Sequence, residues 1–415
     1  MKKLKTLCVT LALWAPLAAI AQDIVINAEN FPDENFRAFL LEQDYGKDGV
    51  ITEEEIAGIT NISIYSSNVS SLEGIEHFTS LRILVCRNSK LSFLDVSKNS
   101  ALRQLACSSA KLTSLDVSAN TALTYLDCSD NQLTSLDISA NTALTSLVCN
   151  RNPLTALDVS GCSTLTTLEV SGCTSLTALD VSGCTALTTL SCNSNQLTTL
   201  NIPNTLKKLD CSNNKLALLD VSNHTMLESL SCDGYSLGDD IRQLTSLDVS
   251  GCTALKELHC SNNQLTSLDV SGCPVLLDIN CSNNLLVSFN IPQNIEEFNY
   301  WDCSYNQLTS LDLSQCYAFE SLLCNNNQLT SLDLSQCVIV VNLDCSHNQL
   351  TSLALSQCVY ADDIDCSYNQ LTSLLLGQVL ETEPSLSCYC NQLKGEAMDN
   401  LISSLPPYRR GNMYI

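Results

Sequence analysis

The chain has 415 residues, of which 44 are acidic and 20 are basic, and its formal net charge at pH 7 is −24. Such an acidic surface disfavours nucleic acid and anionic lipid, and it favours basic or neutral partners or serves only to keep the chain soluble. No phosphate-binding G-x-x-x-x-G-K-[ST] loop, H-E-x-x-H zinc site or G-x-S-x-G nucleophile motif occurs, so we expect no catalysis.

Residues 1–21 have the pattern of a secretory signal peptide. Lysines precede an apolar run, and the small residues Ala19 and Ala21 predict cleavage after Ala21. No other stretch is long and apolar enough to span a membrane. We therefore expect an exported protein, either secreted or held at a bacterial cell surface, with no membrane span once the signal is removed.

Residues 22–60 predict a helical, EF-hand-like cap at the N-terminal end. Phe36, Phe39 and Leu40 recur at helical spacing, and Asp33 is a typical residue for a helix N-terminus. This spacing predicts a short amphipathic helix that starts just after Asp33.

The segment 44–55 then resembles an EF-hand calcium loop, with Gly49 at the sharp turn. Gly46 supplies no side-chain oxygen at the third position of the loop. Two interpretations stay open, namely a weak calcium site and a helix-turn-helix cap that has lost its metal. One calcium ion is the only cofactor indicated, and its ligands would be Asp44, Asp48, the Val50 carbonyl, Thr52 and Glu55.

From residue 61 to residue 393 one phrase recurs with a period close to 21, L-x-x-L-x-C-S-x-N-x-L-T-S-L-D-V-S-x-N-T-A. A period of about 20 to 29 residues with leucines at i and i+3 and a following Asn is the signature of a leucine-rich repeat. The fold class predicted is therefore an α/β repeat, a leucine-rich repeat solenoid with one short strand per turn in a concave parallel β-sheet. The repeats make a binding surface far more plausible than an active site.

One cysteine occupies the same core position in almost every turn. In stacked turns the Cβ atoms of neighbouring cysteines would be about 4.8 Å apart, and their Cα–Cβ bonds would point the same way. This separation is wider than the ~3.8 Å between the Cβ atoms of a disulfide. We therefore expect buried free thiols that act as small apolar fillers. A second column of cysteines lies on the outer turn, in S-G-C and S-Q-C. The structural cysteine ladder consists of Cys86, Cys107, Cys128, Cys149, Cys192, Cys211, Cys232, Cys260, Cys281, Cys303, Cys324, Cys345, Cys366 and Cys388.

Two polar positions of the phrase have structural interpretations. The Asn three residues after the cysteine, such as Asn131, suits a buried ladder that satisfies backbone groups where each strand ends. The Asp of L-D-V-S, such as Asp137, is expected to accept backbone N–H bonds in a tight turn. Because these aspartates repeat everywhere and converge nowhere, a catalytic role for them is not expected.

Residues 394–415 form the C-terminal end. A short capping helix is predicted, with Met398, Leu401, Ile402 and Leu405 facing inward, and the prolines that follow should end it. The last residues read as the start of a strand, as in the truncated product of a longer protein. A separate irregularity, an insertion at 233–243, lengthens one turn, and it is either a functional loop or a tolerated insertion.

The outward positions of the concave sheet change character along the chain. Early turns carry mostly Ser, Thr, Gln and Ala there, whereas late turns carry Tyr, Asp and His. Strands two turns apart are about 10 Å apart, so the late residues form one acidic, aromatic patch or reflect drift at solvent-facing positions. The candidate partner-binding residues are Tyr300, Asp302, Tyr305, Asp344, His347, Asp363, Asp365 and Tyr368.

The phrases L-x-x-L-x-C-S-x-N-x-L and L-D-V-S, over about residues 81–393, resemble those of the internalin-type bacterial leucine-rich repeat proteins, most closely the internalin J-like subgroup with a cysteine ladder. The resemblance implies a secreted or cell-surface protein that recognises a protein or glycan on a host or neighbouring cell through its concave sheet. No internalin-type sorting signal or immunoglobulin-like tail follows the repeats, which leaves surface retention open.

Two functions follow from these observations. The first is protein–protein recognition or adhesion without catalysis, of which a glycan-binding adhesin is a variant. The second is a calcium-stabilised spacer or a component of a surface assembly.

Overall fold

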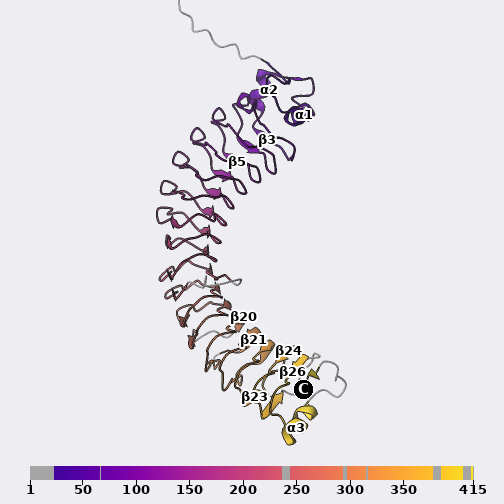
Figure 1. Cartoon of the computed structure of the whole chain (residues 1–415), viewed down its shortest axis with the longest axis vertical. Coiled ribbons are helices and arrows are strands. Elements are labelled where there is room, and N and C mark those ends of the chain that lie inside the picture. Colours follow the sequence, from indigo (N-terminus) through magenta and orange to yellow (C-terminus); the bar gives the residue numbers. More distant parts are fainter. Residues whose placement is uncertain are drawn as a thin grey trace, which may run out of the picture.

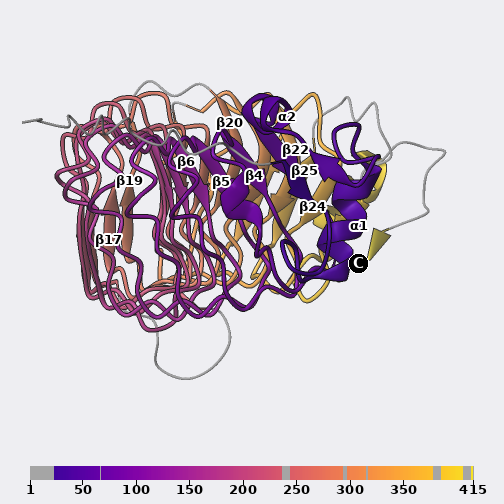
Figure 2. The same cartoon turned by 90° about the horizontal axis from the view of Figure 1, so that it is seen from above.

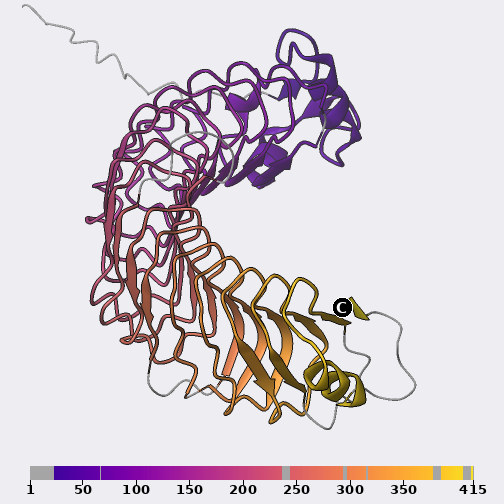
Figure 3. The ribbon, with the colours of Figure 1, turned by 60° about the horizontal axis from the view of Figure 1, so that its bottom comes forward.

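The computed structural model describes residues 23–65, 67–235, 244–292, 297–314, 316–376, 385–404 and 413–414. Over these residues the turns stack into one long arc (Figure 1), which is open between its two ends when it is tilted (Figure 3). The leucine-rich repeat solenoid predicted from the sequence is confirmed. The signal peptide predicted at residues 1–21 lies outside the described residues.

The inner side of the arc is a parallel sheet in which each turn contributes one strand. The central apolar residue of each strand pairs with that of the next, as in Leu105, Leu126 and Leu147, so every turn has the same register. The strands are β3 (Asn61–Ser63), β4 (Ile83–Val85), β5 (Gln104–Ala106), β6 (Tyr125–Asp127), β7 (Ser146–Val148), β8 (Thr167–Glu169), β10 (Thr189–Ser191), β12 (Lys208–Asp210), β14 (Ser229–Ser231), β16 (Glu257–His259), β18 (Asp278–Asn280), β20 (Glu297–Asp302), β21 (Ala318–Leu323), β22 (Ile339–Asp344), β24 (Asp363–Asp365), β26 (Ser385–Ser387) and β27 (Met413–Tyr414).

The return half of each turn forms short strands and bends in place of helices. Seen from above, the turns overlap as closely stacked loops (Figure 2). L-D-V-type segments of neighbouring turns pair in parallel, two strands at a time. These pairs are β9 (Ala178–Asp180) with β11 (Thr199–Asn201), β13 (Leu218–Asp220) with β15 (Ser246–Asp248), β17 (Ser267–Asp269) with β19 (Ser288–Asn290), and β23 (Ser352–Leu355) with β25 (Ser373–Leu376).

Short helices lie at the two ends of the arc (Figure 3). At the N-terminal end are α1 (Glu34–Glu42), α2 (Glu53–Gly58) and the 3₁₀ turn η1 (Ile75–His77), together with the antiparallel pair β1 (Ile24–Val25) and β2 (Val50–Ile51). The Asp33 side chain caps α1 and also accepts hydrogen bonds from Ser70 and Ser71, which ties the helix to the first turn. Among the described residues, no helix combines the length and apolarity that crossing a membrane requires.

At the C-terminal end, α3 (Glu396–Ser404) lies beside β25. Leu401 is buried and Met398 is half-buried, as its amphipathic pattern predicts. The prediction for Ile402 is wrong, because its side chain is exposed. In a nine-residue helix that covers a narrow sheet end, the apolar stripe in contact is too narrow to include both neighbouring positions. Leu405 lies outside the described residues.

The core between the two sides is built from columns of leucine and cysteine. Every cysteine of the ladder is a free thiol with 6% or less of its surface exposed. Burial raises the pKa of the Cys86 thiol to about 12, and it raises the pKa of Cys324 well above its ordinary value. The ladder thiols therefore stay protonated at neutral pH and behave as small apolar groups.

Buried asparagines join each turn to the one before it. Asn327 donates from Nδ2 to the carbonyls of Cys303 in the previous turn and Cys324 in its own turn, at 3.0 and 3.1 Å. Its Oδ1 accepts from the backbone N–H of Leu308 at 3.0 Å. Asn131, Asn284 and Asn348 make equivalent bonds. One side chain thus satisfies buried backbone groups of two turns at once.

A second ladder on the outer side changes its chemistry along the chain. In early turns Asn120 and Asn141 donate to carbonyls of the preceding turn. In late turns cysteines hold the same position, and Cys337 and Cys358 donate from Sγ to the carbonyls of Cys316 and Cys337, at 3.2 and 3.1 Å. The thiol therefore replaces the amide as a weaker donor in the same contact.

The aspartates of L-D-V-S have the structural role that the sequence predicts. In each case the carboxylate accepts from the backbone N–H of the serine two residues later, as Asp137 does from Ser139 at 2.9 Å. These hydrogen bonds lower the pKa of Asp137 and of its equivalents Asp116 and Asp333. These hydrogen bonds stabilise a bend in each turn, and the aspartates of neighbouring turns stack in one column.

Replacing Asn327 with alanine should lower the free energy of unfolding by about 3 kcal/mol, because it leaves several buried backbone groups without partners. Urea unfolding followed by circular dichroism measures the change. The control is Gln328→Ala, since the neighbouring Gln328 side chain is exposed and the change should have little effect. Equal stability of the two variants would contradict a structural role for the ladder.

Thiol labelling of the folded protein at pH 8 should modify Cys390 and spare the ladder, because Cys390 is the one exposed cysteine among the described residues. In denaturant all ladder thiols should react. Mass spectrometry of labelled peptides identifies the modified cysteines in the folded and in the denatured protein. The Cys390→Ser variant is the control, since its folded form should not be labelled. Rapid native labelling of Cys324 or Cys345, or disulfide-linked peptides between ladder positions, would show that the thiols are not buried.

Candidate recognition surface

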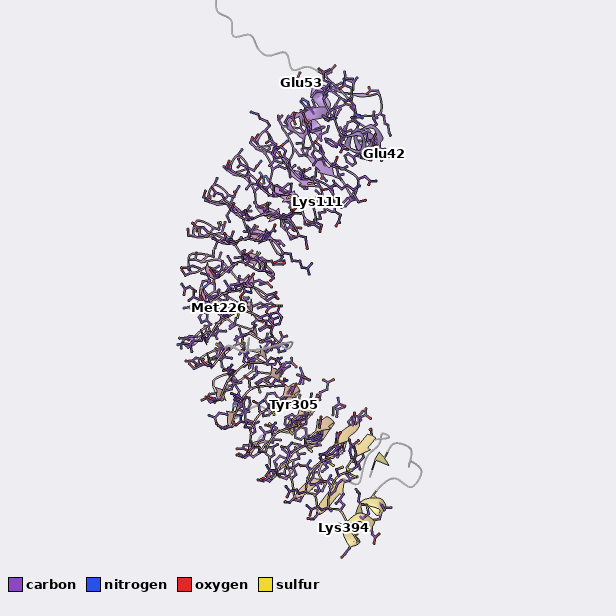
Figure 4. All side chains as sticks on the ribbon, viewed as in Figure 1. Glu42, Glu53, Lys111, Met226, Tyr305 and Lys394 are labelled. Carbon is purple, nitrogen blue, oxygen red and sulfur yellow. The ribbon has the colours of Figure 1, made fainter. Side chains whose placement is uncertain are left out.

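The candidate residues lie on the inner side of the last third of the arc. They occupy two columns of strand positions and one position in the loop that follows each strand. Tyr300 and Asp363 are in the first outward column, in register with Ser321 and Asn342. Asp302, Asp344 and Asp365 are in the second outward column. Tyr305, His347 and Tyr368 occupy the turn that follows each strand, and Figure 4 shows Tyr305 on the inner side of the arc. We call this region, from β20 to the turn after β24, the C-terminal concave face.

The aspartates of the second column are partly committed to the fold. Asp302 accepts from the backbone N–H and hydroxyl of Ser304, at 2.9 and 2.6 Å, and is 8% exposed. Asp344 accepts from Ser346 in the same way, at 3.0 and 2.7 Å. Their carboxylates therefore stabilise the turn, and only the part of each carboxylate that is not bonded to serine is accessible to a ligand.

Burial also changes the acidity of this column. Partial burial raises the pKa of Asp344 despite the bonds from Ser346, and the charge of Asp365, its partner in register, adds to the rise. Tyr300 donates from its hydroxyl to Asp302 at 3.3 Å, and burial raises the pKa of this tyrosine to about 12. A cation placed between Asp344 and Asp365 would relieve their repulsion.

The turn residues form an aromatic row with an unusual backbone. His347 stacks on Tyr368 with ring centroids 4.2 Å apart, and Tyr368 meets Tyr389 edge to face at 5.2 Å. Tyr305, His347 and Tyr368 have φ between 52° and 54°, the left-handed region. Most earlier turns place Asn, Ser, Asp or Gly here, for example Asn283 with φ 55°, and one places Arg151, with φ 53°. The sequence analysis missed Tyr389, which stands where most turns have serine.

Bulky residues in this conformation are unfavourable. The left-handed region costs an L-residue roughly 1 to 2 kcal/mol, and only Gly, Asn and Asp adopt it routinely. Tyr305 and Tyr368 are nevertheless 54% and 44% exposed, so core packing does not account for them. Local strain without a packing benefit is typical of functional positions.

An apolar strip, also missed from the sequence, lies at the opposite edge of the same strands. Tyr317, Ile339 and Val359 are 47%, 37% and 49% exposed. They occur in successive turns joined by backbone hydrogen bonds from Val338 to Tyr317 and from Val359 to Val338, both 2.8 Å. Ile339 is the first residue of the six-residue strand β22, whereas Tyr317 directly precedes β21 and Val359 lies a few residues before β24.

Charge is distributed unevenly along the arc. Between Lys256 and Lys394 the sequence contains no lysine or arginine, whereas acidic residues recur throughout this segment. In the early turns, by contrast, Arg87 forms an ion pair with Asp127 at 2.8 Å on the inner side. The C-terminal concave face therefore lies in a strongly negative region of the molecule.

The candidate calcium ligands are engaged with the protein itself. Asp44 pairs with Lys47, and the Asp48 carboxylate accepts from the backbone N–H of Val50. Glu55 closes a capping box with Thr52 at the start of α2. Over the part of the chain that the structure describes, no group of three His, Cys, Asp or Glu side chains is arranged to hold a metal ion.

The insertion at 233–243, for which a functional loop and a tolerated insertion were both open, is described only at its start. Asp233 accepts from the backbone and hydroxyl of Ser261, at 2.7 and 2.8 Å, and so joins two turns. Residues 236–243 lie outside the described residues.

Comparison with known proteins agrees with this geometry. A family model for leucine-rich repeats in two copies matches residues 121–161, and a second leucine-rich repeat model matches residues 172–191. The solved functional domain of internalin J from Listeria monocytogenes, described as including a cysteine ladder, is 30% identical; the match covers 83% of this chain and 82% of that one, with a TM-score of 0.61. This chain belongs to the internalin-type leucine-rich repeat proteins.

Two further proteins are similar to this internalin-type chain, one in sequence and one in fold. A segment of 71 residues is 34% identical to internalin J of Listeria monocytogenes serotype 4b (strain F2365), and it spans 17% of this chain and 8% of that protein. A leucine-rich repeat protein of Leptospira interrogans shares the fold at 21% identity, with a TM-score of 0.63 over 87% of this chain and 97% of that one.

In this internalin-type chain, Tyr305→Asn should raise the free energy of unfolding by about 1 kcal/mol, because Asn tolerates the left-handed backbone that strains Tyr. Thermal and urea unfolding measure the gain. Tyr317→Asn is the matched control, since Tyr317 is also exposed but does not have a positive φ. If Tyr305→Asn is destabilising, the tyrosine is packed and unstrained, and the argument for function loses its basis.

Proposed function

We propose that this chain is an exported recognition or adhesion protein that binds a protein partner through its C-terminal concave face and catalyses no reaction. The observation that carries the proposal is the pair Tyr305 and Tyr368, which are exposed although their backbone conformation is unfavourable. Exposed aromatic rings on a rigid sheet give large contact area at low entropic cost, which is typical of binding hot spots.

The fold supplies the rigidity that such a surface needs. Each outward position is fixed by the buried ladders beneath it, so the aromatic row is presented in one geometry before any partner arrives. Export from the cell is the setting in which an adhesive surface of this kind would act, and the lysine-rich apolar start of the chain supports it.

Two alternatives are less well supported. A glycan ligand would need free aromatic faces, yet His347 and Tyr368 cover one face of each other. A calcium-stabilised spacer would need Glu55 to leave its capping box with Thr52 and Asp44 to leave Lys47. Calcium binding in this loop stays a prediction.

The test places a photo-crosslinking amino acid at Ser321 on the concave face or at Ser335 on the outer side, and exposes each protein to intact neighbouring or host cells. A partner should crosslink from Ser321 and not from Ser335. The Tyr305→Ala/Tyr368→Ala variant should weaken that contact by about 1 to 2 kcal/mol per tyrosine. Met226→Ala, exposed and remote in sequence, is the control. Equal crosslinking from Ser335 would refute the proposal, and so would crosslinking from Ser321 that is unchanged in the Tyr305→Ala/Tyr368→Ala variant.

A further inference from the structure

The chemistry of the C-terminal concave face restricts what can cover it. Glu320 is exposed on the inner side in the turn of β21, Asp362 and Asp363 are exposed there two turns later, and Asp344 and Asp365 lie half-buried beside them. Because the segment between Lys256 and Lys394 contains no lysine or arginine, these charges have no basic neighbour within their own part of the chain. The counter-charge must come from outside.

The same strands also expose apolar surface. Ile339 starts β22 and Asp344 ends it, so the apolar strip of Tyr317, Ile339 and Val359 lies roughly 15 Å from the acidic column, along one strand. The half-buried Val338 and Tyr360 continue the strip beneath the exposed side chains. Solvent contact with this much apolar surface is unfavourable, and burial against a partner would remove it.

Crossing the face from one edge to the other therefore gives three zones in a fixed order. The apolar strip comes first, the acidic positions lie in the middle, and the aromatic row of Tyr305, His347 and Tyr368 follows at the far edge. A wholly polar cation would leave the strip in water, and a wholly apolar segment would bury the carboxylates without partners. A ligand that suits all zones must carry both apolar side chains and positive charges.

We infer that the C-terminal concave face binds a cationic amphipathic polypeptide segment, with its apolar side chains on the strip formed by Tyr317, Ile339 and Val359 and its lysines or arginines on the acidic positions. This inference rests on the proposed recognition function and names the partner chemistry for the same surface. A second copy of the chain is a poorer occupant, because two molecules that each carry a net charge of −24 repel one another.

The probe is a synthetic peptide of alternating lysine and leucine, labelled for fluorescence anisotropy. Two matched peptides replace every leucine with serine or every lysine with glutamate. The first peptide should bind, the serine peptide about tenfold more weakly, and the glutamate peptide not detectably. Raising the salt concentration from about 50 to 300 mM should weaken the first complex. Equal affinity of the lysine–leucine and lysine–serine peptides would overturn the role of the strip.

Variants of the full chain locate the binding. Ile339→Ser/Val359→Ser removes apolar surface, and Glu320→Gln/Asp363→Asn removes two charges from the face; each should weaken binding about tenfold. The control Glu53→Gln/Glu54→Gln removes the same charge from exposed positions at the opposite end of the arc and should bind like the wild type. If both charge variants lose affinity equally, the attraction is that of a polyanion for any cation, and the inference fails.

Failure of this inference is separable from failure of the recognition function. Crosslinking from Ser321 that persists while no cationic peptide binds would overturn the partner chemistry and leave recognition intact. The opposite result is also possible: the peptide binds and needs both the strip and the acidic positions, but Ser321 crosslinks to no cellular partner. That result would support the cationic amphipathic ligand and refute the proposed recognition function. Light scattering that shows a dimer dissolved by Glu320→Gln/Asp363→Asn would make a second copy the occupant and overturn the inference.

Discussion

The arrangement of this protein depends on how each turn satisfies the backbone of the turn before it. A chain that bends every ten residues or so exposes many N–H and C=O groups to its own core. The inner asparagine solves this with one side chain, since Asn327 donates to two carbonyls and accepts from Leu308. Removing the amide would leave partners in two turns unpaired, which is why the position is polar in an otherwise apolar interior. The contact is kept even where a turn is longer, since Asn263 donates to the carbonyl of Cys232 across the insertion.

Once the inner columns are fixed, the outward positions are free to vary without cost to the fold. The early turns use this freedom for small polar residues, and the late turns use it for aromatic, acidic and apolar residues. The turn after each strand is the exception, because its backbone is left-handed in nearly every repeat. Tyr305 and Tyr368 adopt this left-handed conformation at a backbone cost that Asn283 largely avoids.

Cysteine serves two physical purposes here, and neither is crosslinking. On the inner column the thiol fills a small apolar volume between leucines, and burial keeps it protonated. On the outer column Cys337 and Cys358 occupy the place of Asn120 and Asn141 and donate weakly to the preceding turn. Elsewhere on the outer side neighbouring return segments also pair directly as short strands, as β23 does with β25.

The sequence by itself determined the solenoid, its parallel inner sheet, the buried cysteines, the inner asparagine ladder and the aspartate turns, because each turn repeats the same local pattern and only one stacking buries it. It also located the outward residues Tyr305, His347 and Tyr368. Only the tertiary structure decided which neighbours those residues contact. The register between turns decided that His347 stacks on Tyr368 and that Tyr317, Ile339 and Val359 gather at one edge. The local turn geometry decided that Asp302 accepts hydrogen bonds from Ser304. The exposure of Ile402 was likewise set by how α3 meets the last turns, since helical periodicity fixes a face but not which neighbour covers it.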